Sequence, residues 1–88
     1  MHNYKELKVW QKSMDLTVKV YQLTSMFPDS EKYNLTSQAR RSSVSIPSNI
    51  AEGAGRHTKA DFSRFLDIAY GSSSELDTQL ILSHDLIF

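Results

Sequence analysis

Arginine and lysine side chains are the groups in this sequence whose chemistry points most readily to a ligand. Guanidinium and ammonium groups bind phosphate, and four candidates stand between positions 40 and 59: Arg40, Arg41, Arg56 and Lys59. Arg56 and Lys59 fall at one predicted corner, beside the start of a helix, where anions are favoured. The other interpretation is that all four are ordinary solvated charges.

The overall charge limits what these cations can do. The sequence has 10 Lys+Arg and 10 Asp+Glu, which gives a formal net charge of zero. Proteins whose main activity is a non-specific grip on phosphate usually carry a marked basic excess. A local basic patch is still compatible with this balance.

Catalytic and metal-binding patterns are not found in the sequence. The three histidines, His2, His57 and His84, lack the spacing of metal ligands. The run 53–55 (Gly-Ala-Gly) precedes a helix, but the Lys-Ser/Thr pair of a phosphate-binding loop does not follow it. The serine runs at 42–45 and 72–74 have no base in a recognisable arrangement. We therefore expect no catalytic residues, no metal site, no cofactor and no enzymatic activity.

The segment from Lys5 to Phe27 is predicted to be the first helix, because no glycine or proline interrupts it before Pro28. Its apolar residues form two stripes roughly 140° apart at about 100° per residue, with Ser13 and Thr17 between them. The first stripe comprises Val9, Leu16, Val20, Leu23 and Phe27, and the second comprises Leu7, Trp10, Met14, Val18 and Tyr21.

Two apolar stripes on one helix predict burial on two sides, because a helix in a simple bundle needs only one. We expect one stripe to line the subunit's own core and the other to contact a neighbouring subunit. Trp10 and Tyr21 are typical interface residues, so the second stripe is the candidate oligomer interface. The other interpretation is a single wide core face.

The segment 35–54 is predicted to be the second helix. An apolar row of Leu35, Ala39, Ser42, Ile46 and Ile50 runs beside a polar row of Gln38, Arg41, Ser45, Asn49 and Glu52. The polar row is either a solvated face or a packed row. In the second case Asn49 and Glu52 would hydrogen-bond other helices and fix their register.

Pro47 stands inside this helical pattern. Either the helix begins at Pro47, or one kinked helix runs through it; we favour the second because the apolar row keeps its phase. The carbonyl around Ser43 then loses its usual donor, and we expect Ser42, Ser43 or water to satisfy it. Gly53 and Gly55 are expected to end the helix in the left-handed conformation.

The third helix is predicted over 59–85. Thr58 and Asp61 resemble a capping box at its start, and Asn34 is the candidate cap of the second helix. The run 71–74 (Gly-Ser-Ser-Ser) keeps the phase of the helix, so we interpret its small residues as a close helix crossing. Residues 1 to about 5 are expected to be a frayed arm.

The sequence resembles the 23S rRNA intervening-sequence protein family, also called four-helix-bundle proteins. The resemblance covers about Leu7 to Leu82, is most specific over 45–53 (SIPSNIAEG), and is supported by 35–41, 65–66, 69–72 and 75–76. It implies a small bacterial protein whose up-and-down bundles assemble into ring-like homopentamers. Some members are encoded within the 23S rRNA gene, and a related accessory protein of diversity-generating retroelements works with a reverse transcriptase and nucleic acid. No catalytic residues are associated with the family.

These observations together predict one all-α domain over residues 1–88, an up-and-down antiparallel bundle of the four-helix type whose fourth helix is missing. The expected function is a non-enzymatic, homo-oligomeric scaffold or accessory protein for RNA, DNA or a nucleic-acid enzyme. The alternative is a purely structural interaction module with no nucleic-acid role, which the net neutrality favours. The lack of cysteine, of a signal segment and of a spanning apolar run favours the cytoplasm and no membrane partner.

Overall fold

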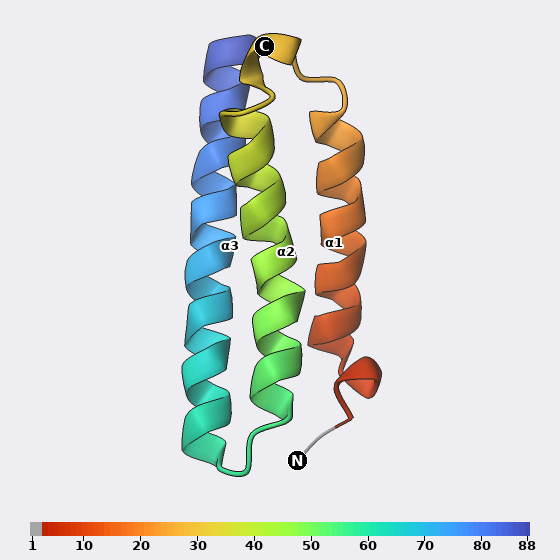
Figure 1. The fold of residues 1–88 in the computed structure, drawn as a ribbon, viewed down its shortest axis with the longest axis vertical. Coiled ribbons are helices and arrows are strands. Elements are labelled where there is room, and N and C mark those ends of the chain that lie inside the picture. Colours follow the sequence, from red (N-terminus) through yellow and green to blue (C-terminus); the bar gives the residue numbers. More distant parts are fainter. Residues whose placement is uncertain (1–2) are drawn as a thin grey trace.

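In the computed structural model, which describes residues 3–88, three long helices run antiparallel beside one another (Figure 1). α1 spans Lys8–Thr24, α2 spans Leu35–Ala54 and α3 spans Lys59–Ile87. Short 3₁₀ turns at Tyr4–Glu6 and Asp29–Glu31 precede α1 and α2. The predicted all-α class is confirmed, and within residues 3–88 there is neither a strand nor a fourth long helix.

The first helix is shorter than the sequence predicts. Residues 4–6 form a separate 3₁₀ turn, capped by the Asn3 side chain, which accepts a hydrogen bond from the Lys5 amide at 3.2 Å. Leu7 is extended, so α1 begins at Lys8 instead of Lys5. At the other end α1 stops at Thr24, and the chain tightens into i→i−3 bonds, from the Met26 amide to the Leu23 carbonyl and from the Phe27 amide to the Thr24 carbonyl, before Pro28. Of the predicted frayed arm, Met1 and His2 lie outside the described residues, and 3–5 belong to the ordered turn.

The caps of the other two helices differ in how well the sequence predicted them. The Thr58 hydroxyl accepts from the Asp61 amide at 3.1 Å, which confirms the cap of α3. The Asn34 side chain makes no capping bond. Instead the Glu31 carboxylate accepts from the Leu35 amide at 3.4 Å, because the preceding 3₁₀ turn brings Glu31 beside the open end of α2.

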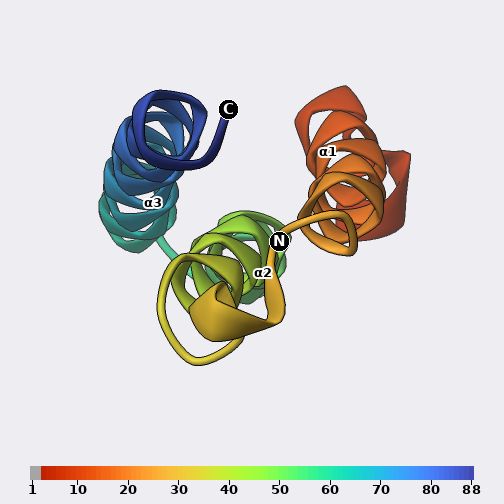
Figure 2. The same cartoon turned by 90° about the horizontal axis from the view of Figure 1, so that it is seen from above.

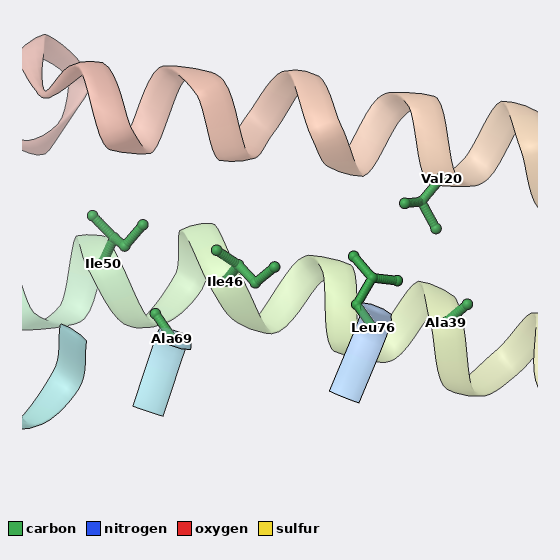
Figure 3. Close-up of a cluster of buried hydrophobic side chains, with 6 residues drawn as sticks. All are labelled: Val20, Ala39, Ile46, Ile50, Ala69 and Leu76. Atoms are coloured by element: carbon green, nitrogen blue, oxygen red, sulfur yellow. The ribbon is translucent and has the colours of Figure 1, made fainter. Parts of the chain in front are cut away.

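α2 is the central helix of the fold. It packs against α1 on one side and α3 on the other, and within residues 3–88 the backbones of α1 and α3 do not approach each other (Figure 2). The hydrophobic core lies along the inner side of α2. Its buried members are Val20 from α1, three α2 residues and two α3 residues (Figure 3): Val20, Ala39, Ile46, Ile50, Ala69 and Leu76.

Pro47 lies within a continuous α2, so the interpretation of one helix running through it is confirmed. The prediction that a local serine or water would bond the freed Ser43 carbonyl was wrong. The Ser43 carbonyl accepts from the Thr17 hydroxyl of α1 at 2.9 Å, and the same hydroxyl lies 2.9 Å from the Ser13 carbonyl. Ser43 is fully buried, so a partner from the neighbouring helix replaces the water or local serine that an exposed carbonyl would use.

Gly53 and Gly55 do not adopt the left-handed conformation expected of them. Gly55 has φ −82° and ψ −5°, and no glycine in the described chain has a positive φ. Gly53 is needed for space instead. A Cβ built on it would lie 2.7 Å from the Phe65 Cβ and 3.0 Å from Phe62 Cδ1, so its lack of a side chain lets α2 approach the start of α3.

Only part of the small-residue run at 71–74 in α3 lies at a close crossing with α2. Ser72 is buried and its hydroxyl lies 2.8 Å from that of Ser45 in α2. Gly71 faces open space, with nothing within 4 Å of a Cβ built on it. No helix in the described part of the chain has both the length and the apolar character needed to cross a membrane.

Replacing Thr17 by valine tests the bond to the Ser43 carbonyl. Thr17→Val keeps the side-chain shape but leaves a buried carbonyl unpaired, so we expect the free energy of unfolding to fall by about 1–3 kcal/mol. Urea denaturation followed by circular dichroism measures it. Thr78→Val is the control, because Thr78 only bonds the Ser74 carbonyl of its own helix on an exposed surface. Equal losses for both variants would contradict the role assigned to Thr17.

A matched pair of glycine substitutions tests the close approach of α2 and α3. We expect Gly53→Ala to lower the free energy of unfolding by about 1–2 kcal/mol, because its clash with Phe65 exceeds the gain in helix propensity of roughly 1 kcal/mol. Gly71→Ala should raise it by about 0.5–1 kcal/mol, since the new methyl meets nothing. The idea fails if Gly53→Ala is as stabilising as Gly71→Ala in the same denaturation experiment.

Candidate nucleic-acid and assembly surfaces

α1 contacts α2 through the line of residues that lies between its two apolar stripes. Ser13, Thr17 and Thr24 lie on this line, and Val20 of the first stripe lies beside it. Thr17 reaches the Ser43 carbonyl, and Thr24 accepts from Arg40. Small and hydroxyl-bearing side chains let the two helices pack closely here. As a result neither stripe of α1 is wholly buried, and apolar side chains remain exposed on both flanks of the contact.

The second stripe, which is the candidate oligomer interface, divides along its length. Leu7 and Trp10 are half-buried and pack against the chain's own core, and Trp10 meets the Tyr4 ring edge-on at 5.2 Å between centroids. Met14, Val18 and Tyr21 are exposed, Val18 to 56%. An available apolar surface on this flank therefore consists of the last three residues of the stripe.

Only some residues of the first stripe are buried in the core. Val20 and Phe27 are buried, and the Phe27 ring meets that of Phe88 at 6.0 Å, which links the end of α1 to the end of α3. The remaining members are exposed: Val9, Leu16 and Leu23. The expectation that one whole stripe lines the core is therefore wrong, because the contact with α2 falls between the stripes and only the residues nearest to it are covered.

The polar row of α2 is packed at its centre and solvated elsewhere. Asn49 donates to the Ser45 carbonyl at 2.8 Å and to its hydroxyl at 3.0 Å, and Ser45 in turn reaches Ser72 of α3. The other three members are exposed: Gln38, Arg41 and Glu52. Of this row only Ser45 makes a hydrogen bond to α3. The interpretation in which Asn49 and Glu52 bond other helices is wrong, because Asn49 bonds within α2 and Glu52 pairs with Arg56 just after it.

The four candidate phosphate-binding cations fall into two separate groups. At about 1.5 Å per helical residue, Arg41 and Arg56 are roughly 20 Å apart along the direction of α2. Arg40 and Arg41 lie near the connection from α1 to α2, and Arg56 and Lys59 lie where α2 turns into α3. One compact ligand site on one chain cannot use both groups.

At the turn from α2 to α3, the positive charge is partly neutralised. The Arg56 guanidinium pairs with the Glu52 carboxylate at 2.6 Å and lies 4.8 Å from the centroid of the Phe65 ring. Glu52 also lines the shallow pocket beside Arg56, together with Tyr4 and His57. Lys59 is exposed. An anion at this end of the bundle would have to compete with the Glu52 carboxylate.

A second pocket, which we term the α1–α2 corner pocket, contains cations without a carboxylate. It has a volume of ≈ 410 Å³ and is lined by Tyr21, Lys32, Tyr33, Thr36, Ser37, Arg40 and Arg41. Arg40 is held in place, because its Nε donates to the Thr24 hydroxyl at 2.9 Å and its guanidinium lies 4.6 Å from the Tyr21 ring centroid. Lys32 lies 5.5 Å from the centroid of the Tyr33 ring.

Sequence reasoning missed Lys32 and Tyr33 as members of this site. The signal available was a basic residue next to an aromatic one in the connector before α2, but nothing in the sequence alone placed that connector beside Arg40. The sequence also did not predict that the ring of Tyr21, a candidate oligomer contact, lies against Arg40. Across residues 3–88, no group of three or more His, Cys, Asp or Glu side chains is arranged to hold a metal ion.

Comparison with known proteins places the chain in a family. No curated protein matches it. The family model of the 23S rRNA-intervening sequence proteins matches residues 5–88, which include all three helices and both cation groups. The chain therefore belongs to the 23S rRNA-intervening sequence protein family.

Proposed function

We propose that this protein is a non-enzymatic, oligomeric helical-bundle scaffold that binds nucleic acid, or a nucleic-acid enzyme, in the bacterial cytoplasm. Membership of a family named after the 23S rRNA supports the link to nucleic acid. The observation that carries the proposal is that exposed apolar side chains line both flanks of α1, next to a pocket of unneutralised cations. The first feature supports self-association, and the second supports an anionic partner.

Self-association follows from the cost of leaving apolar surface in water. Three helices leave Met14, Val18 and Tyr21 exposed on one flank of α1. Each such side chain gains roughly 25 cal/mol for every Å² of apolar surface that a neighbouring subunit removes from water. A ring of identical subunits, such as the homopentamer that the family resemblance implies, would cover this flank in every copy.

A charged substitution on this flank tests the assembly. We expect Val18→Glu to lower the native mass measured by light scattering, because a carboxylate buried at a subunit contact has no partner. Lys19→Gln is the matched control, since it changes the charge by the same −1 on the solvated face of α1, and it should leave the mass unchanged. A wild-type protein with the mass of one chain, or a Val18→Glu variant with the wild-type mass, would remove this interface from the proposal.

Nucleic-acid binding is compatible with a net charge of zero because the charges are unevenly placed. Each chain offers a small group of cations, and a symmetric oligomer multiplies that group by the number of subunits. A partner that contacts several subunits at once gains avidity without any new contact. A long polyanion such as RNA is the kind of partner that can do so.

Salt dependence tests this part of the proposal. We expect the wild-type protein to bind a structured RNA at low salt, with an affinity that falls by about a hundred-fold or more between 50 and 200 mM salt, because bound phosphates release counterions. Fluorescence anisotropy at a series of salt concentrations gives the slope. No binding at low salt would favour the alternative, a structural interaction module without a nucleic-acid role.

A further inference from the structure

We propose that the α1–α2 corner pocket binds one nucleotide of a single-stranded nucleic acid. Lys32, Arg40 and Arg41 hold its phosphate, and its base stacks on Tyr33. This inference rests on the proposed function and assigns it to a site. RNA and single-stranded DNA share this phosphate and base chemistry, so the experiment below uses both as probes.

The charge of the pocket is the first argument. Three cations line it and no carboxylate does. Two acidic groups stand in the connector before α2: Glu31 is directed at the Leu35 amide at the start of α2, and Asp29 lines an adjoining pocket shared with Lys32 and Arg40. The pocket therefore keeps a positive excess, unlike the opposite end of the bundle, where Glu52 pairs with Arg56 at 2.6 Å.

The rigidity of Arg40 is the second argument. Its Nε bonds Thr24, its Nη2 lies 3.5 Å from the Tyr21 carbonyl, and the Tyr21 ring supports its flat face. A guanidinium held in this way loses little freedom when it binds a phosphate oxygen. Arg41 makes no ion pair within residues 3–88 and is exposed, so its charge is also available.

The exposed ring of Tyr33 is the third argument, and it favours a single strand. Its side chain belongs to a residue that is 84% exposed, with Lys32 near its face. An aromatic ring beside a basic pocket is the arrangement that single-strand binding proteins use to stack a base. Bases inside a duplex are already stacked on each other, so only an unpaired base can use Tyr33. The Thr36 and Ser37 hydroxyls in the same pocket can bond sugar or phosphate oxygens.

Substitutions at Tyr33 test the stacking. The full chain is titrated with labelled single-stranded RNA, single-stranded DNA and duplex RNA of equal length, and binding is followed by fluorescence anisotropy at low salt. We expect both single strands to bind more tightly than the duplex. Tyr33→Ala should weaken single-strand binding by about five- to hundred-fold, and Tyr33→Phe should retain it, because stacking needs the ring and not the hydroxyl.

Substitutions of the cations test the location. The double variant Lys32→Gln with Arg41→Gln should reduce the slope of log affinity against log salt by up to about 0.7 for each occupied site, since the one phosphate contact of a site on a single strand contributes roughly 0.7. The control is Arg56→Gln with Lys59→Gln, which removes the same charge at the opposite end of the bundle. Arg40 is left in place because it also holds α1 against α2.

The outcomes separate this inference from the proposed function. If the wild-type protein binds single strands but the Tyr33 and Lys32–Arg41 variants bind equally well, the site is wrong while the proposed function stands. A larger effect of Arg56→Gln with Lys59→Gln, or tighter binding of duplex RNA, would also overturn the site. If the wild-type protein binds none of the three probes, the nucleic-acid role itself fails, and the site with it.

Discussion

The packing of this bundle depends on one buried carbonyl. Pro47 stands in the middle of α2 and cannot donate to the Ser43 carbonyl one turn earlier. Ser43 is fully buried, so water does not replace the missing donor. The Thr17 hydroxyl of α1 supplies it at 2.9 Å. The missing hydrogen bond would weaken α2 if the helix stood alone. The carbonyl gains a donor only when α1 lies against α2 in one register.

That register determines which groups the molecule displays. With Thr17 opposite Ser43, the next two turns of α1 place Tyr21 and Thr24 against Arg40, which forms one wall of the α1–α2 corner pocket. The same rotation of α1 turns its small and hydroxyl-bearing residues toward α2 and leaves apolar side chains such as Met14, Val18 and Leu16 exposed on either flank. The candidate binding pocket and the candidate assembly surface are both consequences of how α1 is set on α2.

Much of this fold could be predicted from local patterns, and much of the site could not. Helical periodicity gave the bounds of α2, and the Thr58 cap marked the start of α3. The donor to the Ser43 carbonyl was missed because it comes from a residue 26 positions away. The role of Gly53 was missed for the same reason: its conformation is ordinary, and the need for glycine arises from Phe65 in another helix. Lys32 and Tyr33 join Arg40 only through the path of the connector, which sequence spacing does not encode.

The central claim is that Thr17 is needed because Pro47 removes the donor to Ser43, and a double-mutant cycle between Thr17→Val and Pro47→Ala measures this dependence directly. Alanine at position 47 restores an amide that can bond the Ser43 carbonyl within α2. The account predicts that the loss caused by Thr17→Val shrinks by about 1 kcal/mol or more in the Pro47→Ala background, because the carbonyl is no longer left unpaired. The same loss in both backgrounds would show that Thr17 stabilises the protein independently of Pro47, and would contradict the account.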